Sequence, residues 1–364
     1  MKTLKISLKT PFNLSYWWNL GSLLGIIMVI QIVSGVLLTL YYENSEMCFD
    51  SIYLIHIETF YGVLIHFIHL NLASLIFLLM YFHMLKGLIF NSFSSLKWAW
   101  VSGWMMMMLL MLSAFMGYVL PWGQMSLWGA TVITNLLSAV PYLGKSMVEW
   151  IWGGYFVSNF TMKMFFSLHF LVPLLVLVLI MIHILILHYY GSSSPIGSSF
   201  LSKTEFNPMY SWKDLISFTL FVFLIIMMFM SPYKTSDPEN FIKSNPMVSP
   251  IHIQPEWYFL QYYAILRAIP NKLGGVLFFV LALLALLMMP MFKFPGNLNM
   301  MMLWNLVVSF FLTVNLMLIW LGGLPVESPY LEISQVFTII YFFWFMFLML
   351  MKNLKFSELM IYLQ

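Results

Sequence analysis

Four histidines in long apolar segments form two pairs with the same spacing. His69 and His83 lie in one apolar run, and His169 and His183 lie in another, so that 14 residues separate the members of each pair. Fourteen residues of α-helix make about 3.9 turns, which places both members on one face and about 21 Å apart. Two such helices side by side would present two stacked imidazole couples, as two axially ligated haems require. Packing explains a single buried histidine better, but two equal pairs favour haem ligation.

Two pairs of glycines repeat this spacing. Gly21 and Gly35 are 14 residues apart in the first apolar run, and so are Gly103 and Gly117 in the third. Glycine allows a bulky group to approach the backbone, although membrane helices also use it for contacts with one another. Matching pairs on helices that alternate with the histidine helices indicate space for two flat macrocycles.

The chain is too apolar for a soluble domain. Its 364 residues are 62% hydrophobic and only 8% charged, with a mean hydropathy of +0.91. Apolar runs of about 18 residues or more are typical of membrane spans. The sequence predicts eight of them, at residues 18–42, 62–90, 99–120, 165–190, 212–232, 275–292, 300–321 and 333–351. Because lipid cannot satisfy backbone polar groups, these long runs predict an all-α polytopic membrane protein.

Charge predicts how the spans are oriented. With eight spans both termini lie on one side, and that side receives ten of the 16 basic residues but only three of the 13 acidic ones. The basic excess marks it as the cytoplasmic side or its organellar equivalent, and the net charge of +3 gives no indication of nucleic-acid binding. The second and fourth spans then run in the same direction, so His69 pairs with His169 near the outer face and His83 with His183 near the inner face.

The single cysteine limits the possible cofactors. Cys48 alone cannot form an intrachain disulfide, a cysteine zinc site or a four-cysteine iron–sulfur cluster, and there is no C-x-x-C-H motif for covalent haem attachment. Any haem is therefore expected to be bound non-covalently.

The long loops divide the chain into two predicted parts. Residues 1–200 hold the first four spans and an aromatic, amphipathic loop at 121–164, which is expected to lie along the membrane interface. Residues 201–364 hold the last four spans and a loop that contains the sequence PEWY. Both long loops fall on the acidic, outer side, where loops of this length predict a functional site.

A few polar residues near the two faces are suited to proton chemistry. Glu256, in PEWY, lies among aromatic residues that are expected to raise its pKa and to suit it to accept a proton from a bound hydroxyl. At the inner end, His188 and the Lys213–Asp214 pair could deliver protons to a quinone. Solvated helix-end charges would explain these residues equally well. His56 and His252 are expected in polar loops.

The order of several long motifs resembles a known family. PWGQMS, WGATVITNLLSA, VEWIWGG, PEWYFL and AILRAIPNKLGG, together with the histidine pairs, are similar to cytochrome b of the cytochrome bc1 complex, or respiratory complex III, over almost the whole chain. The resemblance implies eight transmembrane helices, of which the first four form a bundle around two b haems. It implies that His69 and His169 bind the low-potential haem and that His83 and His183 bind the high-potential haem, and it places the four paired glycines against the haems.

The resemblance also assigns two quinone sites. The quinol oxidation site would contain Tyr118, Gly129, Pro255, Glu256 and Tyr263, with Glu256 and Tyr263 in catalytic roles. The quinone reduction site would contain His188, Ser192, Lys213 and Asp214.

Four positions depart from the family pattern. Arginines near the haems are replaced by His66, Lys86 and Met164, and a glycine after the first ligand is replaced by Leu72. Neither lysine nor histidine reproduces the planar fork of a guanidinium, so the pairing of the haem propionates is expected to differ from that of the family. The four histidines are all present, so haem ligation is not affected.

The function implied is that of a quinone-cycling enzyme subunit. Ubiquinol would be oxidised at the outer face, with one electron passing to a Rieske iron–sulfur protein and the other crossing the membrane to reduce ubiquinone, coupled to proton translocation. Cytochrome c1, further complex III subunits, membrane lipid and a second copy of the complex are the other partners implied. The implied location is the mitochondrial inner membrane with both termini on the matrix side, in preference to a bacterial cytoplasmic membrane.

Two other functions fit the spacing alone. One is a two-haem electron conduit of another quinone-linked oxidoreductase, with quinone at only one end. The other is a transporter without redox chemistry, whose intramembrane histidines relay protons.

Overall fold

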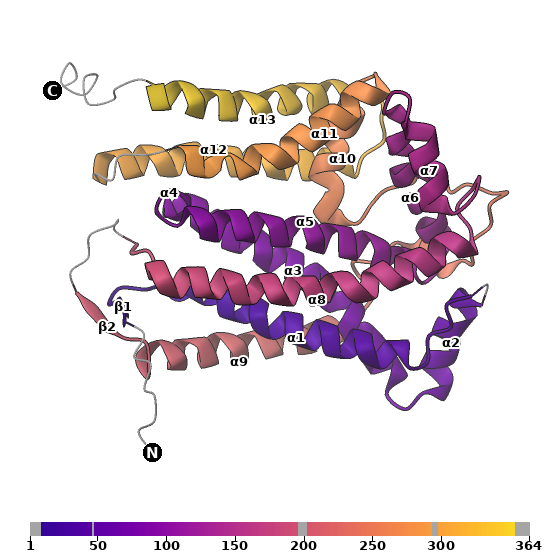
Figure 1. Ribbon diagram of the computed structural model, residues 1–364, viewed down its shortest axis with the longest axis horizontal. Coiled ribbons are helices and arrows are strands. Elements are labelled where there is room, and N and C mark those ends of the chain that lie inside the picture. Colours follow the sequence, from indigo (N-terminus) through magenta and orange to yellow (C-terminus); the bar gives the residue numbers. More distant parts are fainter. Residues whose placement is uncertain (1–8, 46, 196–201, 293–297, 354–364) are drawn as a thin grey trace. The chain divides into compact units, whose positions relative to one another are not determined.

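The computed structural model describes residues 9–45, 47–195, 202–292 and 298–353, and these residues form helices and one short sheet (Figure 1). The chain forms two compact units, of which the first comprises residues 1–84, 105–192 and 202–254 and the second comprises residues 85–104, 193–201 and 255–364. Some of the charged residues that entered the orientation count lie outside the described residues, namely Lys2, Lys5, Glu46, Lys293, Lys355 and Glu358.

The first unit contains most of the long helices. Two of its helices, α3 and α5, continue into the second unit. Its elements are β1 (Lys9–Pro11), η1 (Tyr16–Asn19), α1 (Leu20–Thr39), α2 (Cys48–Glu58), α3 (Gly62–Ile89), α5 (Lys97–Val119), α6 (Gln124–Asn135), η2 (Leu136–Ala139), α7 (Gly144–Trp152), α8 (Asn159–Tyr190), β2 (Lys203–Glu205), α9 (Met209–Phe229) and η3 (Pro238–Phe241).

The second unit is built around a short helix. This helix, α10, packs against α11, α12 and α13. The elements that lie wholly in the unit are α4 (Ser92–Ser95), η4 (Trp257–Phe259), α10 (Leu260–Ala268), α11 (Lys272–Leu287), η5 (Met289–Met291), α12 (Leu298–Gly322) and α13 (Tyr330–Asn353).

The prediction of an all-α membrane protein is confirmed, with one difference in the number of spans. Among the described residues, seven helices are long and apolar enough to cross a membrane, one fewer than the eight predicted. The remaining predicted span, 275–292, overlaps the apolar helix α11, which begins three residues earlier and has 16 residues. Its α-helical hydrogen bonding stops before Pro290, which has no N–H to donate, and η5 follows.

The helices that carry the paired residues share a core within the first unit. Buried side chains from α1, α3, α8 and α9 pack together there, including Ile27, Leu72, Val176 and Phe221. Leu72 is only 1% exposed. The leucine that departs from the family pattern therefore fills a packed position between the helices.

α8 is a long helix whose start is fixed by its own sequence. Ser158 and Thr161 form a capping box, and the Thr161 hydroxyl also donates to the Trp152 carbonyl over 2.8 Å. Pro173 lies inside α8 and removes the N–H that would otherwise bond to the carbonyl of His169. The helix nevertheless continues past His183, so the 14-residue spacing is a helical one.

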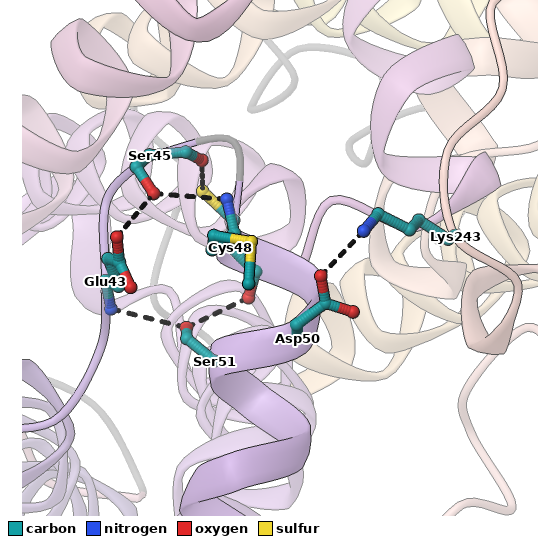
Figure 2. Close-up of polar contacts among 7 residues, drawn as sticks. Glu43, Ser45, Cys48, Asp50, Ser51 and Lys243 are labelled. Carbon is teal, nitrogen blue, oxygen red and sulfur yellow. Dashed lines mark hydrogen bonds and ion pairs between the residues drawn. The ribbon is translucent and has the colours of Figure 1, made fainter.

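Polar contacts fix the start of α2 (Figure 2). The Ser45 hydroxyl donates to Glu43 over 2.9 Å, and the Cys48 thiol donates to the Ser45 carbonyl. Lys243, far along the chain, forms an ion pair of 2.6 Å with Asp50. These contacts connect the segment after α1 with the segment that follows α9.

The N-terminal segment is bound to the start of α9. β1 pairs antiparallel with β2, and the buried Tyr210 hydroxyl donates to the carbonyls of Pro11 and Phe12 over 2.8 and 2.6 Å. Asn19 donates to Ser217 over 2.7 Å. This anchoring sets α1 beside α9 at the predicted inner end of the unit.

Candidate functional site

The outer histidine pair faces across a gap of metal-site size. The ring centroids of His69 on α3 and His169 on α8 lie 6.1 Å apart, at an interplanar angle of 87°. With a metal–nitrogen distance of about 2.0 Å and about 1.2 Å from nitrogen to ring centre, two imidazoles on opposite sides of one metal ion place their centroids about 6.4 Å apart. The pair therefore fits an iron between the two rings.

The inner pair has nearly the same separation. The ring centroids of His83 and His183 lie 6.4 Å apart, at an angle of 61°. The two helices thus bring together the pairs that were expected from span direction, His69 with His169 and His83 with His183. Two equal gaps, one above the other between the same helices, suit two bis-histidine haems.

Hydrogen bonds fix the tautomers of the outer histidines. The Nδ1 atom of His69 donates to the Gln31 carbonyl over 3.1 Å and lies 3.1 Å from the Ser34 hydroxyl. The Nδ1 atom of His169 donates to the Ser113 carbonyl over 2.8 Å. Because Nδ1 carries the proton in both rings, Nε2 keeps a lone pair for a metal, as ligating histidines require.

The sequence analysis missed Gln31, Ser34 and Ser113. Two of them could have been found from their positions, since Ser34 directly precedes Gly35 and Ser113 lies one helical turn before Gly117. Gln31 contacts His69 twice, because its backbone carbonyl accepts from Nδ1 and its side-chain amide donates to the His69 carbonyl over 2.9 Å.

Three paired glycines lie against the histidine rings. A Cβ atom added to Gly35 would lie 2.9 Å from Cε1 of His69, and one added to Gly117 would lie 2.5 Å from Cε1 of His169. At Gly21 the corresponding distance to His83 is 3.3 Å. The glycines therefore leave room for the imidazoles themselves, which refines the expectation that they face the macrocycles. Gly103, the fourth member, lies on α5.

The predicted inner site has a fixed carboxylate and a fixed cation. The Asp214 carboxylate accepts a hydrogen bond of 2.7 Å from Ser22 on α1. Lys213 donates to the Leu14 carbonyl over 2.8 Å, and its ammonium lies over the rings of Tyr16 and Tyr210 at 5.5 and 5.3 Å. The two adjacent residues thus point to different partners.

The other two residues expected at the inner site lie at the end of α8. His188 is on the last turn of that helix, and Ser192 follows it. Within the described part of the chain, neither is bonded to Asp214. Ser22 was missed by the sequence analysis, and its position directly after Gly21 was the available signal.

The residues expected at the outer site belong to both units. Tyr118 on α5 and Gly129 on α6 lie in the first unit, and a Cβ added to Gly129 would meet nothing within 4 Å. Pro255, Glu256 and Tyr263 lie in the second unit. Glu256 directly precedes η4, and its backbone carbonyl accepts a bond of 2.9 Å from the N–H of Phe259.

Tyr263 lies on α10 against the only arginine of the chain. The centre of the Arg267 guanidinium is 4.3 Å from the centroid of the Tyr263 ring. Burial raises the pKa of the Tyr263 hydroxyl, and the guanidinium opposes this effect. The phenol is therefore protonated at neutral pH and can donate a hydrogen bond.

His56 is not in a loop, as had been expected, but on α2. Its Nε2 atom lies 2.8 Å from Nδ1 of His66, about one turn before the predicted ligand His69 on α3. Burial lowers the pKa of His56. His66, which departs from the family pattern, is thus paired with a second histidine.

Comparisons with known proteins agree with this arrangement. A family model described as "Cytochrome b/b6/petB" matches residues 5–191, and one described as "Cytochrome b(C-terminal)/b6/petD" matches residues 243–342. Cytochrome b of Albinaria caerulea is 47% identical over 362 residues, which cover 97% of each chain. A chain of a solved structure described as "Hyperthermophilic respiratory Complex III" is 30% identical, with a TM-score of 0.91 over 96% of this chain and 94% of that one.

The match extends over nearly the whole chain and includes both its sequence and its fold. These matches, together with the membrane-spanning helices, show that the chain is a quinol-cycling subunit of a quinol–cytochrome c reductase. The chain therefore belongs to the cytochrome b/b6 family.

Proposed function

We propose that this chain holds two non-covalent b-type haems, with His69 and His169 binding the low-potential haem near the outer face and His83 and His183 binding the high-potential haem near the inner face. The observation that carries the proposal is the pair of ring separations, 6.1 and 6.4 Å. When bound, the two haems supply an electron path across the membrane. The chain's own part is to orient the outer rings through hydrogen bonds to backbone carbonyls, and to leave space for His69, His83 and His169 at three glycines.

Quinol oxidation takes place near the outer face, at a site that contains Glu256 and Tyr263. The carboxylate of Glu256 accepts a proton from the quinol hydroxyl, and the protonated Tyr263 phenol donates a hydrogen bond that orients the ring. Pro255, which directly precedes Glu256, belongs to the same site. The raised pKa of the Tyr263 hydroxyl, which keeps that group a hydrogen-bond donor, supports this assignment. The role of Tyr118 and Gly129 in quinol oxidation stays a prediction.

Quinone reduction takes place near the inner face, at a site that contains His188, Ser192, Lys213 and Asp214. Asp214 delivers a proton to the reduced quinone, with Ser22 holding its carboxylate in place. Lys213 supplies a fixed positive charge beside it. His188 and Ser192 contribute further polar groups from the end of α8.

The proposed substrates are ubiquinol and ubiquinone, and the proposed partners are a Rieske iron–sulfur protein, cytochrome c1 and other subunits of a dimeric complex III. The solved relative, which is a chain of a respiratory Complex III, supports a multi-subunit assembly. The proposed location is the mitochondrial inner membrane, with both termini on the matrix side. The basic excess on the side of the termini supports this orientation.

Two variants of the assembled complex test the two-site function. Glu256→Gln removes the proton acceptor at the outer site, and Asp214→Asn removes the donor at the inner site, while both variants keep the four histidines proposed as haem ligands. With decylubiquinol as donor and cytochrome c as acceptor, each should lower turnover by about tenfold, the effect of roughly 1.4 kcal/mol on a barrier, with both haem spectra unchanged.

The rival functions predict different results. A conduit with quinone at one end predicts that one of the two variants turns over at the wild-type rate. A transporter without redox chemistry predicts that the purified protein has no haem spectrum at all.

A further inference from the structure

The only arginine of the chain lies where one helix ends on another. The sequence contains fifteen lysines and one arginine, Arg267, so lysine serves at every other permanently cationic position. Arg267 is on α10 and is half-buried. The use of arginine at this one position indicates that the shape of a guanidinium is needed there as well as its charge.

The guanidinium is fixed by three backbone carbonyls, two from the last residues of α12 and one from the turn that follows it. Its Nη2 atom donates to Gly322 over 2.7 Å and to Leu321 over 3.1 Å, and its Nη1 atom donates to Leu324 over 3.1 Å. Carbonyls at a helix C-terminus have no partner within the helix and carry partial negative charge. One planar cation thus donates to three neighbouring carbonyls, which the single point charge of a lysine cannot do with the same geometry.

The approach of the two helices is close at this point. A Cβ atom added to Gly322 would collide with the backbone carbonyl of Leu260, the first residue of α10. The end of α12 is therefore fixed against the start of α10, and Arg267 is attached to a part of the unit that cannot easily shift.

The other side of the guanidinium faces Tyr263. The two residues are four apart on α10 and are therefore neighbours on one helix face. The separation of 4.3 Å between the guanidinium carbon and the ring centroid is a cation–π contact. Burial lowers the pKa of Arg267 and raises that of Tyr263, and each group opposes the shift of the other.

We propose that Arg267 is a positioning residue for quinol oxidation, which fixes the ring of Tyr263 so that its hydroxyl is aimed at the substrate. The inference rests on the proposed role of Tyr263 in the quinol site. Arg267 is proposed to act through Tyr263 and not by contact with quinol. It is bonded to the end of α12 on one side and contacts the Tyr263 ring on the other, so it holds the ring in place relative to α12.

A double-mutant cycle in the assembled complex tests this role. Tyr263→Phe removes the hydroxyl but keeps the ring, and Arg267→Lys keeps the charge but loses the fork. With decylubiquinol as substrate, we expect the rate of quinol oxidation per haem to fall about tenfold for Tyr263→Phe and about fivefold for Arg267→Lys. If Arg267 acts through the hydroxyl, the double variant should match Tyr263→Phe to within about twofold.

A matched control separates positioning from a general weakening of α10. Gln335 on α13 donates to the carbonyl of Ala268, the last residue of α10, over 3.0 Å. Gln335→Leu removes this anchor, and the cycle that combines it with Tyr263→Phe should show independent effects. The same coupling in both cycles would mean that Arg267 has only a structural role, and would overturn the inference.

Other outcomes are also decisive. A double variant reduced about fiftyfold, the product of the single effects, overturns the inference while leaving the proposed quinol site intact. Wild-type rates for both Tyr263→Phe and Glu256→Gln would instead remove the proposed site, and this inference with it. If Arg267→Lys does not accumulate, Arg267→Gln, which keeps a planar donor without the charge, enters the same cycle with the same expected coupling.

Discussion

The Nδ1 atom of His169 lies 2.8 Å from the backbone carbonyl oxygen of Ser113, on the helix that also carries Gly117. The carbonyl fixes the tautomer of the imidazole, and the glycine gives the ring its space. His69 is held in the same way by the Gln31 carbonyl and by the space at Gly35. Each outer histidine proposed as a ligand is thus hydrogen-bonded to a neighbouring helix, α1 or α5, and this contact fixes the orientation of its ring.

A graded alanine series tests the clearance at the glycines. The added Cβ would lie 2.5 Å from the ring of His169 in Gly117→Ala, 2.9 Å from His69 in Gly35→Ala and 3.3 Å from His83 in Gly21→Ala. We expect loss of the outer haem signal in the first variant, partial loss in the second and a small change in the inner signal in the third.

The control for this series is Gly25, on the same helix as Gly21 and Gly35. Gly25→Ala would meet nothing within 4 Å and should leave both haem signals unchanged. The spectra are measured per mole of assembled protein. Equal loss in all four variants would mean that helix packing, and not ligand clearance, requires these glycines.

Substitution of Glu256 should change the pH dependence of turnover. If its carboxylate accepts the quinol proton, turnover falls on the acid side as the carboxylate becomes protonated. In Glu256→Gln we expect a rate lower by about tenfold at neutral pH and the loss of that acid limb. Glu256→Asp, which keeps a carboxylate, should retain the limb at a reduced rate. A wild-type profile in Glu256→Gln would exclude the residue as proton acceptor.

Ser22 is expected to matter only through Asp214. Ser22→Ala removes the hydrogen bond of 2.7 Å to the carboxylate and should slow re-oxidation of the inner haem by quinone about fivefold, the value of one hydrogen bond of roughly 1 kcal/mol. Thr219→Ala is the control, because that exposed hydroxyl bonds only to the Leu215 carbonyl of its own helix. Ser22→Ala should have no further effect when combined with Asp214→Asn. Additive losses would show that Ser22 acts by another route.

The lowered pKa of His56 predicts a loss of stability in mild acid. Above the ordinary histidine pKa of 6.5 the residue is neutral in both folded and unfolded chains, and it has no effect on the pH dependence. Below 6.5 the unfolded chain takes up a proton that the folded chain resists, so the free energy of unfolding falls as the pH falls. Thermal unfolding of the complex in detergent should show this slope, and His56→Gln should make it shallower. An unchanged slope in the variant would contradict the linkage.

Much of the outer and inner pairing could be predicted from residue spacing. The spacing of His69, His83, His169 and His183 defines one face of each helix, and the direction of the spans decides which histidines meet. The hydrogen bonds from the two rings to the Gln31 and Ser113 carbonyls could not be predicted from side-chain chemistry, because the partner of a backbone carbonyl depends on how the helices pack. The position of His56 opposite His66 likewise depends on how the segment before α3 folds back, which no periodic pattern encodes.

Among the described residues, the helix at the sixth predicted span is shorter than the hydropathy pattern indicates, because such a pattern does not register where helical hydrogen bonding stops. Residues 275–292 form a continuous apolar run, but the α-helical part ends at Leu287, ahead of Pro290. Arg267 was missed for a different reason. Its partners are carbonyls at the end of α12 and in the turn after it, more than fifty residues away in sequence. Only the packing of α10 brings the guanidinium within hydrogen-bond distance of them.

The central claim is that two bis-histidine haems are stacked between α3 and α8. A redox titration of the reduced-minus-oxidised spectrum of the purified complex tests it most directly, carried out on the wild type and on His69→Leu and His83→Leu. We expect two b-type components in the wild type, with the low-potential one absent in His69→Leu and the high-potential one absent in His83→Leu. A single component in the wild type, or loss of the same component in both variants, would contradict the claim.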